Sequence, residues 1–339
     1  MKIFFLLFIL VSFVYGDKTL KIATYNVENL FDLQRNGHEY KEYIPYAKSN
    51  WNDKNYKIKL NNLAKVIKHI NADIIALQEI ESLQALKDLR YTLKRKGTYY
   101  QYYKIANLKA TTTKVAILSK VSIIYAHEIS VTSSYRYRNI LEAKFKIYNE
   151  NLYILVNHWK SKAGPESMRI VSAKKLKKRL QELGADKNVI ALGDFNSDYE
   201  EYKVFKRKRR HNDTDGITGI NHILGTIHYQ QKAQNTKIEP YELYNLWYDT
   251  TVDNRYSYIY RGKKEAMDNI LISASLLNAK GIEYKHSSIY PFEKSYLFKG
   301  KSIYRWQTTR SRLRRHKGKG YSDHLPVIAE FVVHQGTNK

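Results

Sequence analysis

Residues 191–198 read Ala-Leu-Gly-Asp-Phe-Asn-Ser-Asp, and this stretch indicates how the rest of the chain is organised. The apolar run 189–192 has the length of a buried strand, and it ends at Gly193. Asp194 and Asn196 follow two residues apart, so a strand end can present a carboxylate and a carboxamide on one side of the backbone. One group can hold a metal or orient a water while the other donates to a phosphate oxygen. The alternative is an ordinary turn after a strand, where Gly, Asp, Asn and Ser are common.

Other predicted strands also have polar residues at their ends. Such strands are expected at 19–27, 72–77, 151–157, 266–272 and 327–333, and the polar residues beside them are Asn26, Glu79, His158, Asp268, Asp323 and His324. If the first two strands are neighbours, Asn26 and Glu79 open onto the same edge of a sheet. A carboxylate at the tip of a buried strand needs a cation, which favours Glu79 as a metal ligand. A single histidine at a strand end, in contrast, is more often structural.

The order of the predicted elements indicates one domain of mixed α/β structure over residues 17–339. Strand-like segments recur along this range without a Pro/Ser-rich linker between them. Apolar residues at helical spacing predict helices at 52–70, at 82–94 and after Gly164-Pro165, the last ending at Gly184. A further helix is expected at 239–248.

The charge of the chain is strongly positive. Lysine and arginine number 58 against 32 acidic residues, which gives a net charge of +26. An excess of this size predicts a polyanionic partner, such as nucleic acid, an anionic membrane or a sulfated sugar. The basic runs 203–211 and 299–320 are candidates for contact with a nucleic-acid backbone. The 30 tyrosines suit base stacking, although the composition bias of an AT-rich genome would also explain them.

The first residues resemble a secretory signal peptide. Lys2 precedes an apolar run at 3–14, and small residues near Gly16 offer a cleavage point. The run is shorter than the roughly 20 residues of a membrane-spanning helix, and no second run of this kind follows. We therefore expect a soluble, monomeric protein, secreted or periplasmic in a bacterium, that begins near Asp17. The chain has no cysteine, which excludes disulfides and thiol chemistry.

Six short motifs, taken together and in order, resemble the endonuclease/exonuclease/phosphatase superfamily, whose fold is that of pancreatic deoxyribonuclease. They are Tyr-Asn-Val-Glu-Asn (25–29), Leu-Gln-Glu-Ile-Glu (77–81), Asn-His-Trp-Lys-Ser-Lys (157–162), Gly-Asp-Phe-Asn (193–196), Met-Asp-Asn-Ile-Leu (267–271) and Ser-Asp-His-Leu-Pro (322–326). The resemblance covers nearly all of residues 18–333 and is closest in style to secreted bacterial nucleases. It implies a four-layer α/β/β/α sandwich, in which two packed mixed sheets are flanked by helices.

The resemblance also implies a role for each polar strand end. Glu79 would be the principal ligand of Mg²⁺, with Mn²⁺ or Ca²⁺ as alternatives, and Asn26 and Asp323 would complete or support its ligand shell. His158 would contact the scissile phosphate or protonate the leaving oxygen. His324 would be the second histidine, oriented and kept protonated by a nearby acid. Asp268 resembles that acid, which also explains a carboxylate at the start of a buried strand.

The remaining implied roles concern the water and the phosphate. Asp194 would position or deprotonate the attacking water, and Asn196 would donate to a non-bridging phosphate oxygen. Whether Asp194 or a histidine takes the proton stays open. The other residues expected to contact phosphate or DNA are Arg138, Lys160, Arg312, Arg314 and Arg315. The chain departs from pancreatic deoxyribonuclease at 111–115, because this stretch lacks the acid that orients the first histidine there.

These features predict a secreted, metal-dependent nuclease that hydrolyses DNA without sequence specificity and leaves 5′-phosphate ends. RNA is an alternative substrate, and exonuclease action is an alternative to endonuclease action. A second possibility keeps the fold but changes the substrate to a phospholipid or phosphoinositide, as in a phosphodiesterase or phosphatase. A third is a basic protein that binds polyanions without catalysis. The unpaired buried acids argue against it, since they are costly to retain without a metal.

Overall fold

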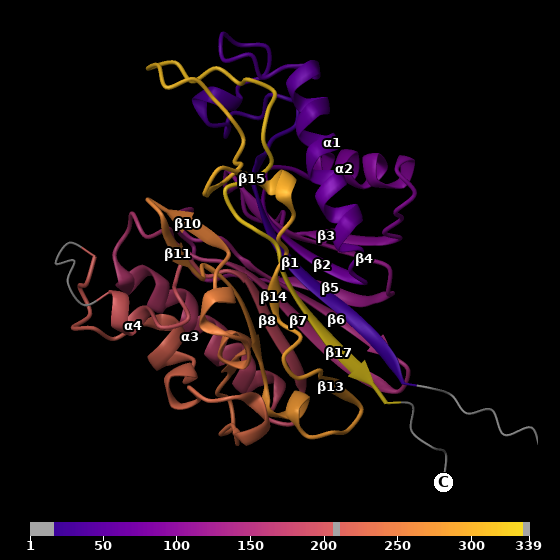
Figure 1. The fold of residues 1–339 in the computed structure, drawn as a ribbon, viewed down its shortest axis with the longest axis vertical. Helices are drawn as coiled ribbons and strands as arrows, with labels where there is room; N and C mark the ends of the chain where they lie inside the picture. Colours follow the sequence, from indigo (N-terminus) through magenta and orange to yellow (C-terminus); the bar gives the residue numbers. More distant parts are fainter. Residues whose placement is uncertain (1–16, 206–210, 335–339) are drawn as a thin grey trace, which may run out of the picture.

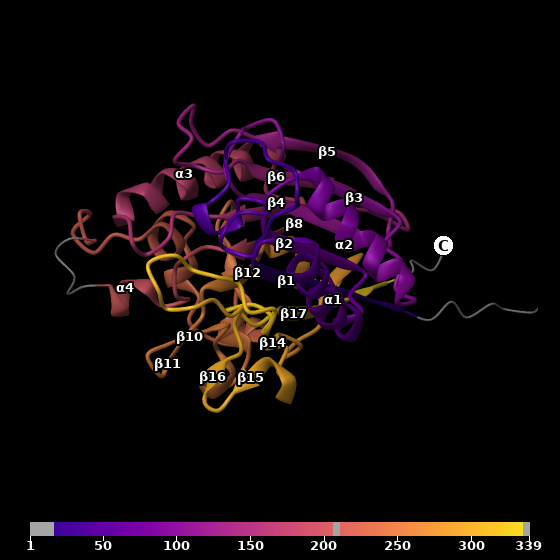
Figure 2. The ribbon, with the colours of Figure 1, turned by 90° about the horizontal axis from the view of Figure 1, so that it is seen from above.

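The computed structural model describes residues 17–205 and 211–334, and it contains two mixed sheets packed face to face with helices outside them (Figures 1 and 2). The predicted signal peptide, residues 1–16, lies outside the described residues, as do residues 206–210 of the basic run 203–211. The four-layer arrangement that the motifs imply is confirmed. In the part of the chain that the structure describes, no helix combines the length and the apolar character needed to cross a membrane.

The first sheet has the strand order β13-β17-β1-β2-β4-β3, with β14 beside β17. Its strands are β1 (Lys18–Leu30), β2 (Ile74–Ile80), β3 (Tyr102–Ile105), β4 (Lys114–Ser119), β13 (Ile282–Tyr284), β14 (Tyr290–Pro291) and β17 (Val327–Val333). β1 and β2 are parallel neighbours, which confirms the expectation that Asn26 and Glu79 open onto one edge.

The second sheet has the order β5-β6-β7-β8-β12-β9. Its strands are β5 (Ile123–Ile129), β6 (Ile140–Ile147), β7 (Glu150–His158), β8 (Asn188–Asp194), β9 (Tyr244–Asn245) and β12 (Asp268–Ile272). Two small hairpins stand apart from both sheets, and their strands are β10 (Tyr258–Tyr260), β11 (Lys263–Glu265), β15 (Phe298–Lys299) and β16 (Ser302–Ile303).

Helices cover the outer faces of both sheets. α1 (Asp53–Ile70) and α2 (Leu83–Arg95) pack on the first sheet, and α3 (Glu166–Leu183) packs on the second; α4 (Glu201–Val204) is a single turn. The Asn52 side chain caps the start of α1 by accepting from the Asn55 amide, and Asn71 ends it in the left-handed conformation. These boundaries agree with the predicted helix 52–70.

The predicted helix at 239–248 is wrong. Tyr241 has a left-handed backbone, with φ of 63°, which a continuous right-handed helix excludes. The segment instead forms β9 and a short 3₁₀ turn, Leu246–Asp249. The Asn245 amide donates to Asn269 at 2.9 Å, so tertiary pairing with β12 replaces the local helix.

Strand alternation explains how the two sheets share one core. Alternate residues of the central strands point between the sheets, where they form a continuous apolar layer. In four strands, this same face becomes polar at the strand end. Leu20 and Ile22 lead to Asn26, Ile154 and Val156 to His158, Ile190 and Leu192 to Asp194, and Ile270 lies two residues after Asp268. The polar side chains therefore gather at one end of the inter-sheet core.

Candidate active site

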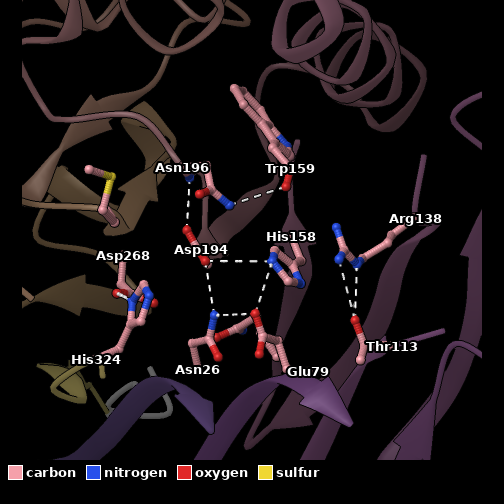
Figure 3. Close-up of polar contacts among 12 residues, drawn as sticks. Asn26, Glu79, Thr113, Arg138, His158, Trp159, Asp194, Asn196, Asp268 and His324 are labelled. Carbon is pink, nitrogen blue, oxygen red and sulfur yellow. Dashed lines mark hydrogen bonds and ion pairs between the residues drawn. The ribbon is translucent and has the colours of Figure 1, made fainter. Parts of the chain in front are cut away.

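A cavity of about 710 Å³ opens at this end of the inter-sheet core. The predicted site residues that line it are Glu79, Arg138, His158, Lys160, Asp194, Asn196, Asp323 and His324. Asn26 and Asp268, which are fully or almost fully buried, contact this set from behind. Figure 3 shows His158, Asp194, Asn26 and Glu79 pointing toward one another, with the His324–Asp268 pair on one side and Arg138 on the other. The structure thus brings together side chains that lie far apart in the sequence.

Asn26 lies behind the cavity lining and joins two of its carboxylates, those of Glu79 and Asp194. Its amide nitrogen donates to Glu79 Oε1 at 3.2 Å and to Asp194 Oδ2 at 3.0 Å. Its oxygen accepts from the backbone N–H of Glu28 at 3.0 Å. The amide group therefore holds Glu79 and Asp194 close to each other despite their like charges.

The backbone around Glu79 directs its carboxylate into the cavity. Regular alternation would turn Glu79 away from the inter-sheet face, but its φ of 66° is left-handed. The register between β1 and β2 also shifts at this point, between Asn26 and Leu30. The Asn29 amide, also left-handed at φ 61°, donates to Glu79 Oε2 at 2.9 Å and fixes the side chain. Strained backbone of this kind concentrates at functional sites.

His324 and Asp268 form a buried pair. His324 Nδ1 lies 2.6 Å from Asp268 Oδ2, and the same oxygen accepts from the Ser257 hydroxyl at 2.6 Å. Burial alone would lower the pKa of the imidazole, but the adjacent Asp268 carboxylate raises the pKa of His324 well above its usual value. The imidazolium is therefore the favoured form, in line with what the family resemblance implies.

We expect Asp268→Asn to lower the pKa of His324, because the variant loses the charge that stabilises the imidazolium. In the wild type the protonated form persists below the raised pKa and is lost as the pH rises through it. The NMR titration of the imidazole should shift to lower pH in the variant. The alkaline limb of the pH–rate profile should move in the same direction. An unchanged titration would show that Asp268 does not control the charge of His324.

His158 has the opposite character. Burial, together with the charges of Arg138 and His324, lowers the pKa of His158 well below its usual value, so the imidazole is neutral. Its Nε2 lies 3.6 Å from Asp194 Oδ2 and 3.8 Å from Glu79 Oε1. Its buried Nδ1 has no hydrogen-bond partner within residues 17–205 and 211–334. No acid is present at 111–115, the stretch in which the resemblance to pancreatic deoxyribonuclease would place one to orient this histidine.

Thr113, in the stretch that lacks the acid, contacts Arg138, the arginine expected to contact phosphate. The Nε and Nη2 atoms of Arg138 each lie 3.3 Å from the Thr113 hydroxyl, and the guanidinium lines the cavity.

Asn196, which is left-handed at φ 47°, donates through its side chain to the Trp159 carbonyl at 3.2 Å. Its backbone N–H donates to Asp194 Oδ1 at 2.8 Å and fixes that carboxylate.

The donor set around Glu79 fits a divalent cation. Burial and the charge of Asp323 raise the pKa of the Glu79 carboxyl, and no lysine or arginine lies within 4.0 Å of it among the described residues. A hard cation held by Glu79 and Asp323 would offset the charge of Glu79, whereas Asp323 already has the Arg305 guanidinium at 3.2 Å. Asn26, a predicted ligand, turns toward Glu79 its amide nitrogen, which cannot bind a cation, while its oxygen accepts from the Glu28 N–H. Ligand atoms of Asp194, Asp268 and His324 also lie within 4.8 Å of one another, but Asp268 and His324 are already bonded to each other.

The three predicted DNA-binding arginines of the basic run, Arg312, Arg314 and Arg315, do not line this cavity. They are exposed near the tip of a hairpin formed by residues 304–321, which we call the basic hairpin. That they contact DNA stays a prediction.

Sequence reasoning missed how three charged residues, Glu28, Lys59 and Arg305, connect the basic hairpin to the cavity. Arg305 donates through Nε to Glu28 Oε1 at 2.8 Å, and its Nη2 lies 3.2 Å from Asp323 Oδ2. The ammonium of Lys59, on α1, is fully buried and donates to the carbonyls of Glu28 and Tyr321 at 2.9 and 2.8 Å. The glutamate of Tyr-Asn-Val-Glu-Asn (25–29) was a signal for Glu28, whereas nothing local pointed to Lys59.

Gly193 allows β8 to approach β7 directly before Asp194. Its φ is +134°, and an added Cβ would lie 2.0 Å from the carbonyl oxygen of Asn157. We expect Gly193→Ala to lower the free energy of unfolding by at least about 3 kcal/mol, because backbone strain of about 1–3 kcal/mol adds to this clash. Urea denaturation would measure it. Gly97→Ala is the matched control, since Gly97 has φ +80° but open space around it, and it should cost only about 1–2 kcal/mol. Equal losses would contradict the close approach.

Comparison with known proteins gives a family and a fold. The model of a family described as "Endonuclease/Exonuclease/phosphatase family" matches residues 21–333. No curated protein matches the chain. A humanized D. rerio TDP2 with 14 mutations has 15% identity and a TM-score of 0.57, over 92% of this chain and 98% of that one. D. rerio TDP2 complexed with single strand DNA product has 14% identity and a TM-score of 0.56, over 93% and 99%. A Bacteroides thetaiotaomicron mannosyl-6-phosphatase has 14% identity and a TM-score of 0.54, over 92% and 99%.

Proposed function

The chain belongs to the endonuclease/exonuclease/phosphatase family, and on this premise we propose that it is a secreted, metal-dependent nuclease that hydrolyses DNA phosphodiester bonds. We further propose that it acts as an endonuclease and leaves 5′-phosphate ends. One observation carries the proposal: a single cavity brings together a protonated His324, a neutral His158 and the two carboxylates, Glu79 and Asp194, that Asn26 joins.

The arrangement suits attack by water on a phosphodiester. As the new P–O bond forms and the bond to the 3′ oxygen breaks, the water gives up a proton to a base. The leaving 3′ oxygen takes the proton that the protonated His324 carries on Nε2. The Asp194 carboxylate and the neutral His158 imidazole are both acceptors for the water's proton. The pKa of Asp194, which burial raises to about 7, suits an acceptor at neutral pH.

The negative charge that develops on the phosphate has several donors nearby. His324 can donate through Nε2, because its Nδ1 is bound to Asp268, and the guanidinium of Arg138 lies on the opposite side of the cavity. A divalent cation, when bound, supplies further positive charge and favours the ionised form of the water. Glu79 and Asp323 are the residues that would hold it.

The preference for DNA rests on charge. A net charge of +26 favours a long polyanion, and the relative with a bound single-stranded DNA product shares this fold. Secretion is proposed from the signal-peptide pattern at 1–16. A phosphatase or phosphodiesterase acting on a lipid headgroup is the competing activity, since another relative of the same fold is a sugar phosphatase.

Plasmid DNA incubated with the purified protein in Mg²⁺ and in EDTA tests the proposal. We expect cleavage in Mg²⁺ that stops in EDTA and leaves ends that a ligase can join without prior phosphorylation. Turnover of sphingomyelin or a phosphoinositide without DNA cleavage would replace the proposal with the lipid activity. Salt-sensitive DNA binding without turnover of either substrate would leave only a binding protein.

A further inference from the structure

A second cavity, of about 740 Å³, lies between two parts of the chain. One wall is formed by the end of β1 and by Glu42 and Tyr43 after it, and the other by the basic hairpin and the residues 299–303 before it. We call it the hairpin groove. The residues that matter most in its lining are Asn29, Glu42, Lys299, Arg305, Arg310 and Arg314. We propose that the hairpin groove binds the phosphate backbone of a polynucleotide strand on one side of the scissile bond. The proposal rests on the nuclease activity proposed above and adds a second subsite to it.

The hairpin groove adjoins the cavity of the candidate active site, which we call the catalytic cavity, through single residues. Arg305 lines the groove and lies 3.2 Å from Asp323, which lines the catalytic cavity. Asn29 also lines the groove, and its N–H donates at 2.9 Å to Glu79 on the catalytic side. A strand that leaves the catalytic cavity on this side meets the groove next.

The lining of the groove suits phosphate oxygens. Lys299 and Arg310 are exposed, and neither has a carboxylate within 4.0 Å in the part of the chain that the structure describes. Arg314 lies 3.9 Å from Glu42, a loose pair that leaves the guanidinium largely exposed. Hydroxyl groups from Ser302 and Thr308 add neutral donors. The lining also holds two carboxylates, but Glu28 is paired with Arg305 and Glu42 lies near Arg314. Lys299 and Arg310, which have no carboxylate partner among the described residues, fit a polyanion far better than an apolar chain.

The two walls of the groove are fixed to each other before any ligand binds. The side chain of His316 accepts from Trp306 Nε1 at 2.8 Å and lies 2.7 Å from the Glu42 carbonyl, and its backbone N–H donates to Ser49 at 2.8 Å. Its ring also packs against Tyr43 and Trp51. Figure 1 shows the basic hairpin in yellow beside the indigo segment that follows β1. A preformed groove avoids the entropic cost of ordering a loop upon binding.

The double variant Lys299→Ala/Arg310→Ala tests the proposal, with Lys174→Ala/Lys178→Ala on the exposed face of α3 as a control of equal charge. The probe is a single-stranded DNA of about 20 nucleotides, which exceeds the about 4–16 nucleotides that one binding fold typically covers. Binding is measured in EDTA at several salt concentrations. The slope of log K against log salt should be shallower by about 1.4 in the groove variant, which corresponds to about 0.7 for each lost phosphate contact. The control should keep the wild-type slope.

Kinetics in Mg²⁺ provide the second measurement. The KM of the groove variant for the oligonucleotide should rise while kcat stays constant. Hydrolysis of bis(p-nitrophenyl) phosphate, which is too short to reach the groove, should not change. A wild-type slope in the groove variant, or an equal change in the α3 control, would overturn the proposal. If the wild type hydrolyses neither substrate, the proposed activity fails, while the slopes in EDTA still decide whether the groove binds a strand.

Discussion

Replacing His324 with alanine should lower kcat for DNA hydrolysis by about 10²–10⁴-fold, the range that a well-placed acid or base contributes. His324 is the buried, protonated group of the cavity, and Asp268 at 2.6 Å keeps it charged. Its loss removes a cationic donor from the phosphate, where negative charge increases during the reaction. The rate of plasmid cleavage in Mg²⁺, measured at saturating DNA, gives the effect.

A matched control separates this effect from general damage. His127 is an exposed histidine on β5, away from the cavity lining, and His127→Ala should keep the wild-type rate. DNA binding by the His324 variant in EDTA should be close to that of the wild type. A His324→Ala protein that folds and cleaves DNA at a near-normal rate would show that the site is misassigned.

Glu79→Gln should raise the Mg²⁺ concentration needed for half-maximal rate by more than the about 10–100-fold that loss of an outer partner of a metal ligand costs. Glutamine keeps the size of the side chain and its contact with Asn26 but removes the charge that a hard cation requires. Rates at increasing Mg²⁺ concentration would measure the shift, and metal binding by calorimetry would confirm it without turnover.

Glu81→Gln is the control for this substitution. Glu81 follows Glu79 by two residues, but it contacts Asn36 and the Asp32 amide and does not line the catalytic cavity. Its variant should keep the wild-type dependence on Mg²⁺, even if its stability falls. The same Mg²⁺ dependence in Glu79→Gln and the wild type would exclude Glu79 as the principal ligand.

Strand alternation accounts for what could be predicted about the site. Apolar residues at every second position identify the buried face of β8, and Asp194 continues that face at the strand end. The same logic places Asn26, His158 and Asp268. Family resemblance then assigned the roles, including the Asp268–His324 pair that the structure confirms as a contact.

Contacts that depend on tertiary structure could not be predicted in this way. Arg305 and Glu28 are 277 residues apart, so no local pattern links them. The left-handed backbone of Glu79 reverses the direction that alternation assigns to its side chain. The segment 239–248 has helix-compatible composition, yet pairing of β9 with β12 determines its structure. Tertiary packing overrides local preference in each case.

A double-mutant cycle of His158 and His324 tests the central claim most directly, namely that polar ends of separate strands form one catalytic site. The measured quantity is kcat for DNA cleavage in Mg²⁺ by the wild type, His158→Ala, His324→Ala and the double variant. Residues that act as a unit are strongly non-additive, so the double variant should be little slower than the slower single variant. Losses that multiply, as they do for independent positions, or single variants with near-normal rates would contradict the claim.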